Sequence, residues 1–289
     1  MISIDPVIYQ QLCQTLSVNK IYLEETSGGS INKTFKLSAN NRTLFCKVNS
    51  ATNFPHLFKT EAAGLQLLNH AGPLRTPKVI GLLETHSFQI LLLEWIERST
   101  PNHTFWKSFG EGLAALHSHT QSLLGLETDN FMGSLPQKNK SATDWPTFFI
   151  QNRLEPLVQQ CHSQQLLTTH HLLSFQKLYT YIPGIFNEQS PALLHGDLWS
   201  GNYLCAVDKQ PVLIDPATYY GHPSIDLAMT TLFGGFDKAF YEAYHYHTPL
   251  PTNYKEQWKV CNLYPLLIHL LLFGKSYLSS IESTLSDFQ

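Results

Sequence analysis

Apolar and polar positions in the first hundred residues follow two different periods. Five short stretches are continuously apolar or alternate with period two, and polar turn residues such as Ser38–Asn41 separate them, which predicts strands. Between these stretches, Phe54–Leu68 carries apolar side chains at helical spacing and predicts a helix. The predicted strands are Ile21–Glu24, Thr34–Leu37, Leu44–Val48, Val79–Leu83 and Gln89–Glu94.

After Glu94 the pattern changes to longer segments of helical period, with one short β-like stretch at Ala192–Ile214. The polar segment Glu97–Asn102 interrupts the pattern, and we expect the boundary between two lobes near it. The sequence therefore predicts the α+β class, with a small β-rich lobe at 1–96, a larger helical lobe at 97–289 and a cleft between them. The predicted helices are Phe105–His117, Trp145–Gln160, His170–Tyr181 and Lys255–Leu278.

Composition excludes several classes of protein. The 289 residues are 43% hydrophobic and 14% charged, which excludes a disordered chain. A net charge of −3 with 19 basic residues disfavours binding to nucleic acid or to a membrane surface. The most apolar stretch, Leu263–Phe273, is shorter than the roughly 20 residues of a spanning helix. Five widely spaced cysteines without a CxxC pair and an N-terminus without a secretory pattern favour a cytoplasmic protein, which we expect to be a monomer.

The strongest chemical pattern is Leu194–Asn202, in which Asp197 precedes Asn202 by five residues after an apolar stretch. The catalytic loop of protein kinases has the same Asp-to-Asn spacing. A carboxylate there meets the acceptor hydroxyl, and the amide oxygen reaches a metal on the phosphates. The alternative is a simple Gly-Asp turn between two strands.

A second acid, Asp215, ends the apolar stretch Val212–Ile214, thirteen residues after Asn202. In kinase-like folds a hairpin returns the chain at this point, and the acid at its end binds Mg²⁺. Many strands end in Asp-Pro turns, so Asp215 by itself is weak evidence. Together the three oxygen donors suit a hard cation rather than zinc.

The first lobe is then expected to supply a lysine and its partner. Alternation along Leu44–Val48 places Lys47 with Phe45 on one face of the strand and Cys46 on the other. Glu61, fourteen residues later, lies beside the apolar side of the predicted helix and needs a cationic partner there. Lys47 paired with Glu61 would direct its ammonium at the α- and β-phosphates. Taken singly, each residue is more commonly a surface charge.

Two further segments have the composition of nucleotide contacts. Gly28, Gly29 and Ser30 precede a strand and would let backbone amides approach phosphates, although an ordinary turn explains them nearly as well. Glu94, Trp95 and Ile96 lead from a buried strand into the connector between the lobes, where backbone groups would bind adenine. A plain core strand is the alternative there.

Residues His195–Asn202 resemble the fructosamine kinase family, the ketosamine kinases of the aminoglycoside-phosphotransferase-like branch of the kinase fold. The family shares a longer pattern around Asp197 than the short His-Gly-Asp of the whole branch. Further matching segments extend over most of the chain: Gly28–Asn32, Phe45–Asn49, Glu61–Leu65, Leu116–His117, Asp129–Gly133, Asp215–Ala217 and Tyr219–Phe236.

The resemblance implies a bilobal protein-kinase-like fold and ATP-dependent phosphorylation of O3 of a ketosamine, free or attached to a protein, which would serve protein deglycation. It implies that Asp197 is the catalytic base, that Asn202 and Asp215 hold Mg²⁺, and that Trp199 contacts the substrate. Lys47 and Glu61 become the phosphate-orienting pair, and Glu94 to Ile96 the adenine contacts.

The sequence departs from the family pattern at two places. Gly221–Ile225 lacks the acidic residue that many members carry after Gly-His, which affects a local contact but not the phosphate chemistry. Ser30 replaces the cysteine that some members use for redox-linked dimerisation.

Other functions stay open on the sequence. A kinase of the same branch that acts on choline, homoserine or an aminoglycoside is the nearest, and a non-catalytic pseudokinase that binds a partner is another. A protein kinase is disfavoured, because only ten residues separate Asp215 from Asp226, too few for a peptide-presenting segment.

Overall fold

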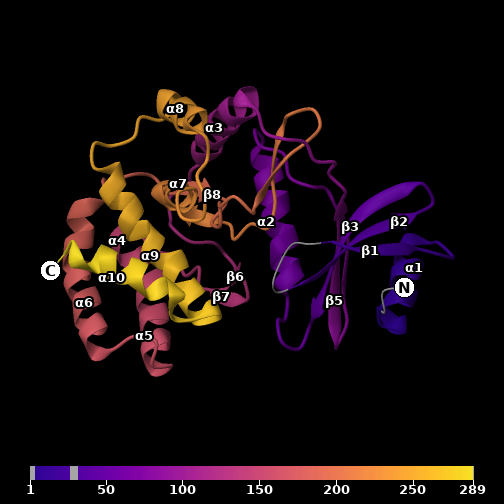
Figure 1. Ribbon diagram of the computed structural model, residues 1–289, viewed down its shortest axis with the longest axis horizontal. Coiled ribbons are helices and arrows are strands. Elements are labelled where there is room, and N and C mark those ends of the chain that lie inside the picture. The colour runs from indigo at the N-terminus through magenta and orange to yellow at the C-terminus, as the bar shows by residue number, and fades with distance from the viewer. Residues whose placement is uncertain (1–3, 27–31, 289) are drawn as a thin grey trace.

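The amino-terminal part of the protein is an antiparallel sheet. A computed structural model describes residues 4–26 and 32–288 (Figure 1). Five strands pair in the order β1-β2-β3-β5-β4, which confirms the predicted β-rich start of the chain. The strands are β1 Tyr22–Glu25, β2 Lys33–Ala39, β3 Arg42–Ser50, β4 Val79–Glu84 and β5 Phe88–Glu94.

Helices cover both faces of this sheet. Leu44, Cys46 and Val48 of β3 share a buried cluster with Leu12 of α1 (Pro6–Leu16), a helix that the sequence pattern did not predict. On the other face, α2 (Leu57–Ala71) packs its apolar side against β5 and lies between the sheet and the rest of the chain (Figure 1). The predicted alternation along β3 is confirmed, so Lys47 lies on the face toward α2.

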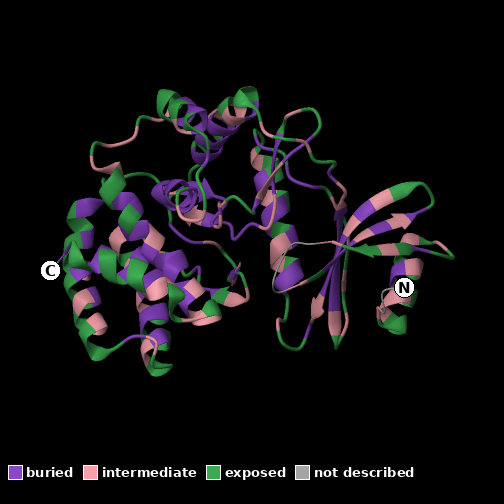
Figure 2. Ribbon diagram, in the orientation of Figure 1, coloured by how far each residue is buried: buried purple, intermediate pink, exposed green. Residues whose placement is uncertain are grey.

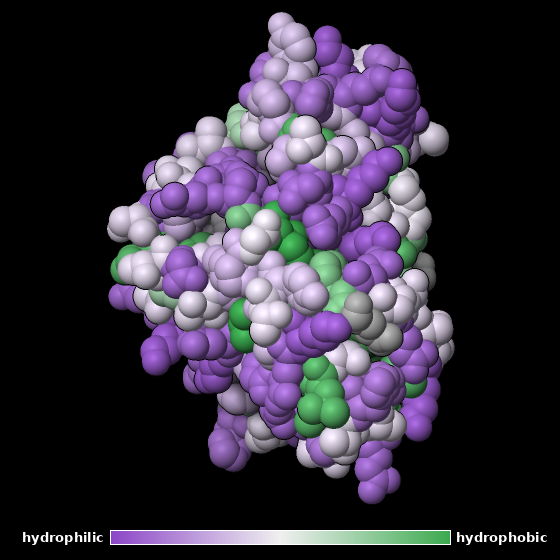
Figure 3. Space-filling view, turned by 90° about the vertical axis from the view of Figure 1, so that its left-hand side faces the viewer, coloured by the Kyte–Doolittle hydropathy of each residue, from purple (hydrophilic) through white to green (hydrophobic). Residues whose placement is uncertain are grey.

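Most of the remaining chain is helical, as predicted, and the α+β class is confirmed. Each helix buries the side that meets its neighbours (Figure 2). The face of the helical part seen in Figure 3 is largely hydrophilic, and its apolar residues form small separate groups. The helices are α3 His103–His117, α4 Trp145–Phe149, α5 Glu155–Ser163, α6 Thr169–Ile185, α7 Ser224–Met229, α8 Lys238–His247, α9 Tyr254–Phe273 and α10 Leu278–Ser286.

Two of the predicted helices have the wrong extent. A π-helical turn, Ile150–Leu154, separates α4 from α5, where the apolar period predicted one continuous helix. The predicted helix Lys255–Leu278 ends at Phe273, because Gly274 takes a left-handed φ of 87° and a short 3₁₀ turn follows before α10. Helices α7, α8 and α10 were not predicted.

Short paired strands lie between the helices and shape the loops around Asp197 and Asp215. β8 (Ala192–Leu194) pairs with β11 (Tyr219–Gly221), and β9 (Tyr203–Cys205) pairs with β10 (Pro211–Leu213). The β9–β10 hairpin returns the chain, so the Ile214 N–H donates to the Asn202 carbonyl at 3.0 Å. A third pair, β6 (Asn130–Met132) with β7 (Leu135–Gln137), packs Phe131 against the α2 cluster.

Among the described residues, none of the helices is both long and apolar enough to cross a membrane.

Candidate active site

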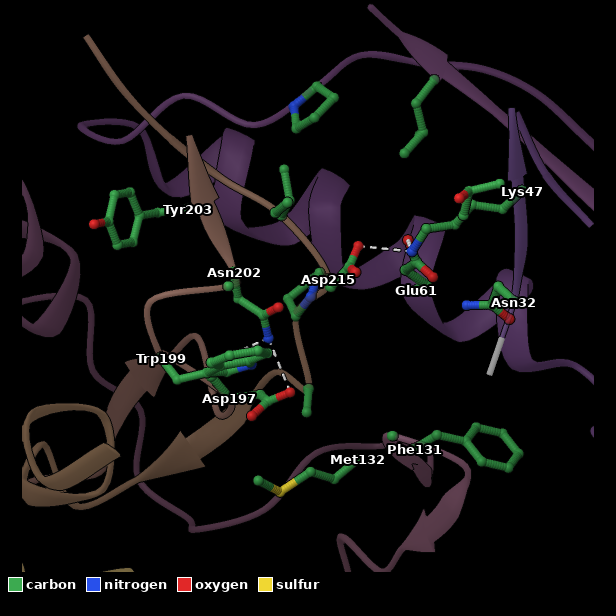
Figure 4. Close-up of a pocket in the computed structure, with 18 of the residues that line it drawn as sticks. Asn32, Lys47, Glu61, Phe131, Met132, Asp197, Trp199, Asn202, Tyr203 and Asp215 are labelled. Carbon is green, nitrogen blue, oxygen red and sulfur yellow. Dashed lines mark hydrogen bonds and ion pairs between the residues drawn. The ribbon is translucent and has the colours of Figure 1, made fainter. Parts of the chain in front are cut away.

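The predicted site residues that the structure describes line one cavity of about 450 Å³ between the sheet and the helical part (Figure 4). Gly28, Gly29 and Ser30 lie outside the described residues. The lining includes Lys47, Glu61, Glu94, Trp95, Ile96, Asp197, Trp199, Asn202 and Asp215.

Lys47 lies at the centre of three charges. Its Nζ donates to Glu61 Oε1 at 2.7 Å, so the predicted pair forms, and the Glu61 side chain is only 10% exposed. Nζ also donates to Asp215 Oδ1 at 2.6 Å, a contact that the sequence pattern did not predict. Burial by itself would lower the pKa of Lys47, but Asp215 and Glu61 outweigh it and raise that pKa, so the ammonium stays charged.

Glu61 is affected by the same burial in the opposite sense. Removal from water raises the pKa of its carboxyl to about 7, although the Lys47 ammonium opposes the shift. The carboxylate form of Glu61 therefore depends on its contact with Lys47.

Asp197 follows β8 in a loop that Asn202 closes. The Asn202 Nδ2 donates to the Asp197 carbonyl at 2.8 Å and to Asp197 Oδ2 at 2.9 Å (Figure 4). Burial raises the pKa of Asp197 to about 7, opposed by the Asn202 hydrogen bond and assisted by the charges of Asp215 and Asp226. A carboxyl with this pKa can accept a proton near neutral pH.

Asn202 and Asp215, the predicted metal ligands, both line the cavity, and Figure 4 shows Asn202 directed toward Asp197 and Asp215 directed toward Lys47. The Asn202 nitrogen already donates to Asp197, which leaves its amide oxygen as the atom for a cation. The described residues contain no group of three or more His, Cys, Asp or Glu side chains arranged for a metal. An amide and a carboxylate oxygen fit Mg²⁺, which usually binds one or two protein oxygens and takes its other ligands from phosphates and water.

A buried acid that the sequence analysis did not single out supports this loop. Asp226 accepts hydrogen bonds from the backbone N–H groups of His195 at 2.7 Å and Gly196 at 2.8 Å, and lies 3.2 Å from His117 Nε2. Its carboxylate thus fixes the backbone directly before Asp197. Asp226 lies within Tyr219–Phe236, one of the segments that resemble the family, and this match was the available sign of its role.

Glu94 ends β5, Trp95 and Ile96 follow it, and all three line the same cavity. The Glu94 carboxylate binds Arg75 at 2.6 Å and accepts from the Lys78 N–H at 3.2 Å. The Trp95 indole donates to Glu97 at 2.8 Å. The side chains of Glu94 and Trp95 are thus held by neighbours. The Glu94 N–H donates to the Lys78 carbonyl at 2.9 Å, which leaves the Glu94 carbonyl as the backbone group that this residue can offer a ligand.

Beyond Trp199 the cavity wall is aromatic and apolar. Trp199 packs edge-on against Phe233 with ring centroids 5.8 Å apart, and Leu272 and Phe273 of α9 complete this end. His269 also lines it, and its Nδ1 is 2.7 Å from the Pro265 carbonyl. The apolar pattern of α9 did not indicate a role for these residues, because the apolar side of a helix usually packs in the hydrophobic core. The acidic residues in the described lining are Glu61, Glu94, Asp197 and Asp215.

Comparisons with known proteins agree with this geometry. The model of the fructosamine kinase family matches residues 3–288. A probable ketoamine kinase from Synechocystis is 37% identical over 97% of this chain and 95% of its own length. The chloroplastic protein-ribulosamine 3-kinase of Arabidopsis thaliana is 31% identical over 98% of this chain and 87% of its own length.

A solved structure of a candidate fructosamine-3-kinase from Thermobifida fusca has 28% identity and a TM-score of 0.88, with 98% of both chains covered. The expected kinase-like fold is thereby confirmed. The chain belongs to the fructosamine kinase family and is a phosphotransferase with an alcohol group as acceptor.

Proposed function

We propose that this protein transfers the γ-phosphoryl group of ATP to O3 of a ketosamine sugar in the presence of Mg²⁺, and that it acts in protein deglycation as a cytoplasmic monomer. The observation that carries the proposal is the convergence of Lys47, Asp197, Asn202 and Asp215 on one cavity in a chain of this family. These side chains supply the cation, the base and the metal ligands that phosphoryl transfer needs.

The nucleotide occupies the side of the cavity next to the sheet. The backbone groups of Glu94 and Ile96 bind adenine, and the Lys47 ammonium, held by Glu61, contacts the α- and β-phosphates. Asn202 and Asp215 hold Mg²⁺ through their oxygens. When bound, the metal supplies positive charge against the phosphate oxygens. Glu61 keeps Lys47 in place when Asp215 turns to the cation.

Asp197 handles the proton of the acceptor hydroxyl. Its Oδ2 accepts from Asn202, so Oδ1 is the oxygen that receives the O3 proton. As the bond from O3 to phosphorus forms, the bond from phosphorus to the bridging oxygen of ADP breaks, and ADP leaves. Asp197 then carries the proton until it is lost to solvent.

The acceptor end of the cavity favours a ketosamine over an aminoglycoside. An aminoglycoside is a polycation, and a site for it needs several carboxylates near the acceptor. Three of the four acids in the described lining are already paired with cations, Glu61 and Asp215 with Lys47 and Glu94 with Arg75. Asp197 is the remaining one, and Trp199 offers a flat face to a sugar ring.

A substrate panel tests this function. ADP release is measured with ribulosamine, erythrulosamine and fructosamine adducts of lysine, free and on a protein, and with choline, homoserine and an aminoglycoside. We expect kcat/KM for at least one ketosamine to exceed that for every other acceptor. A preference for choline, homoserine or the aminoglycoside contradicts the proposal. Turnover of the free adducts without any of the protein-bound ones contradicts the deglycation role.

A further inference from the structure

Arg153 is a fully buried cation that the proposed chemistry does not use. Its side chain has 0% exposure, and the π-helical turn between α4 and α5 directs it into the core of the helical part. Among the ion pairs of residues 4–26 and 32–288, none includes Arg153. A buried charge without a carboxylate partner is costly, and an apolar side chain of similar size is usually the cheaper choice. Its contacts should therefore reveal what it does.

The guanidinium of Arg153 is held by neutral groups. It donates to the carbonyls of Lys138 and, at 3.2 Å, Asn152, and its second amino group donates to Asn139 Oδ1 at 2.8 Å. Its flat face lies 4.0 Å from the ring centroid of Tyr219. The planar fork is thereby fixed between the β7 segment and β11.

A chain of buried amides leads from this fork to the backbone that follows Asp215. Asn139 donates to Asn130 at 3.1 Å, and Asn130 donates to the Thr218 carbonyl at 2.7 Å. Gln137 donates to Asn130 Oδ1 at 2.7 Å and to the Ala217 carbonyl at 3.0 Å. Two successive carbonyls of the segment after Asp215 are thus bonded by Asn130 and Gln137, and Asn139 links this pair to Arg153.

The segment that is held in this way carries an unusual backbone conformation. Asp215 has a left-handed φ of 54°, which is uncommon for a residue that is not glycine. Such a conformation persists only where the surroundings determine it. Arg153 supports the segment twice, through the amides at Ala217 and Thr218 and through the face of the Tyr219 ring.

We propose that Arg153 is a positioning residue that holds the Asp215 carboxylate in the orientation in which it binds the metal of the nucleotide complex. The inference rests on the proposed function in so far as Asp215 is taken to bind Mg²⁺. Arginine suits this task because its planar fork binds three acceptors and an aromatic face at once, whereas an apolar side chain binds none of the polar partners.

The test compares nucleotide binding with and without Mg²⁺ in the full-length protein, by calorimetric titration with a non-hydrolysable ATP analogue. In Arg153→Met we expect the gain in affinity that Mg²⁺ gives to fall by about 10–100-fold, the usual loss when the support of a metal ligand is removed. Affinity without Mg²⁺ is expected to stay as in wild type. An unchanged Mg²⁺-linked gain in a folded Arg153→Met protein overturns the proposal.

Two further variants separate positioning from general stability. Gln137→Met removes the hydrogen bond to the Ala217 carbonyl and leaves Arg153 in place, so it should also lose Mg²⁺-linked affinity. This variant replaces Arg153→Met in the test if Arg153→Met does not fold. Phe175→Leu removes volume from the core at α6, a helix that supplies none of the amide side chains, and should lower Tm while the Mg²⁺-linked gain stays intact. If Phe175→Leu loses that gain equally, Arg153 acts on stability alone and the inference is wrong.

Failure of the proposed function gives a different result. A wild-type protein that binds the nucleotide with Mg²⁺ but phosphorylates no ketosamine leaves the positioning inference standing and refutes only the substrate assignment. A wild-type protein whose nucleotide affinity is independent of Mg²⁺ refutes the role of Arg153.

Discussion

The ammonium of Lys47 joins two carboxylates that are far apart along the chain. Glu61 comes from α2 beside the sheet, and Asp215 comes from the turn after β10, 168 residues after Lys47. The spacing of Lys47 and Glu61 across a strand and a helix made that pair predictable. The contact with Asp215 depends on how the sheet and the helical part pack, and no local pattern in the sequence carries that information.

The pair of Lys47 and Glu61 predicts non-additive mutants. Because Glu61 acts through Lys47, the double variant Lys47→Ala/Glu61→Ala should have the turnover of the worse single variant, Lys47→Ala. Glu61→Ala should retain more activity, since Lys47 can still reach the phosphates. Transition-state free energies from kcat/KM of the three variants give the coupling. Additivity within about 0.3–0.5 kcal/mol means that the contact has no role in catalysis.

Asp197 predicts a pH-dependent rate. Its carboxyl, with a pKa raised to about 7 by burial, must be ionised to accept a proton, so kcat/KM should fall as pH drops below about 7. Asp197→Asn should lower turnover by about 10²–10⁴-fold and leave ATP binding near wild type. Turnover near wild type in this variant removes Asp197 from the role of base.

The pKa of Glu61 lies in the same range as that of Asp197, so either residue could cause the fall of kcat/KM at low pH. The pH profile of Glu61→Gln decides between them. The fall of kcat/KM at low pH should persist in Glu61→Gln if it belongs to Asp197.

Asp197 also makes the stability of the protein depend on pH. Its pKa is raised in the folded state above the ordinary 3.8, so this group favours folding at low pH. That contribution is fully present below about pH 3.8 and is lost as pH rises from there to about 7, and Asp197→Asn should reduce the decline in Tm between these two pH values.

The strands and helices around the site were predicted best where one side of an element is buried. The spacing of apolar residues predicted β3, α2 and β5, because each of these elements packs against a neighbour across the sheet. The structure confirms all three. The π-helical turn at Ile150–Leu154 was missed, because one inserted residue hardly changes the apolar period. The predicted roles of Gly28, Gly29 and Ser30 stay predictions.

The turn between β8 and Asp197 depends on one glycine. Gly196 has a φ of 85°, and a Cβ built there would lie 2.0 Å from the Ala217 carbonyl oxygen. Gly196→Ala should therefore destabilise the protein by more than the roughly 1–2 kcal/mol of a left-handed backbone.

Gly72→Ala is the matched control for that variant. Gly72 has a φ of 107°, and a Cβ there meets nothing within 4 Å. Gly72→Ala should therefore lose only the free energy that a left-handed backbone costs a residue other than glycine. Free energies of unfolding from urea titrations measure both variants. Equal losses show that the close approach of Gly196 to Ala217 does not matter for folding.

The cavity takes its residues from both parts of the molecule. Lys47 comes from the sheet and Glu61 from α2, whereas Asp197, Asn202 and Asp215 come from loops of the helical part. Asp197 and Asp215 were predictable from two short patterns whose spacing supports each other, Leu194–Asn202 and the apolar stretch before Asp215. The aromatic end at His269 and Phe273 was not, since it depends on the direction of α9 in the folded chain. The lobe boundary near residue 96 stays a prediction.

The proposed Mg²⁺ site predicts dependence on metal. Chelation by EDTA should abolish turnover, and excess Mg²⁺ should restore it, because in the proposed complex the phosphates and the oxygens of Asn202 and Asp215 share the cation. Asp215→Ala should lower turnover at every Mg²⁺ concentration. Rates are measured by ADP release. Full activity in excess EDTA contradicts the assignment of Asn202 and Asp215.

The proposed function requires that a ketosamine receives phosphate on O3. An NMR analysis of the product that forms from ATP, Mg²⁺ and a ribulosamine or fructosamine adduct of lysine locates the phosphate. We expect one phosphate on each product molecule, with coupling between phosphorus and the proton on C3, and no such product with Asp197→Asn. A phosphate on another carbon, or no phosphorylated ketosamine while ADP forms with a different acceptor, contradicts it.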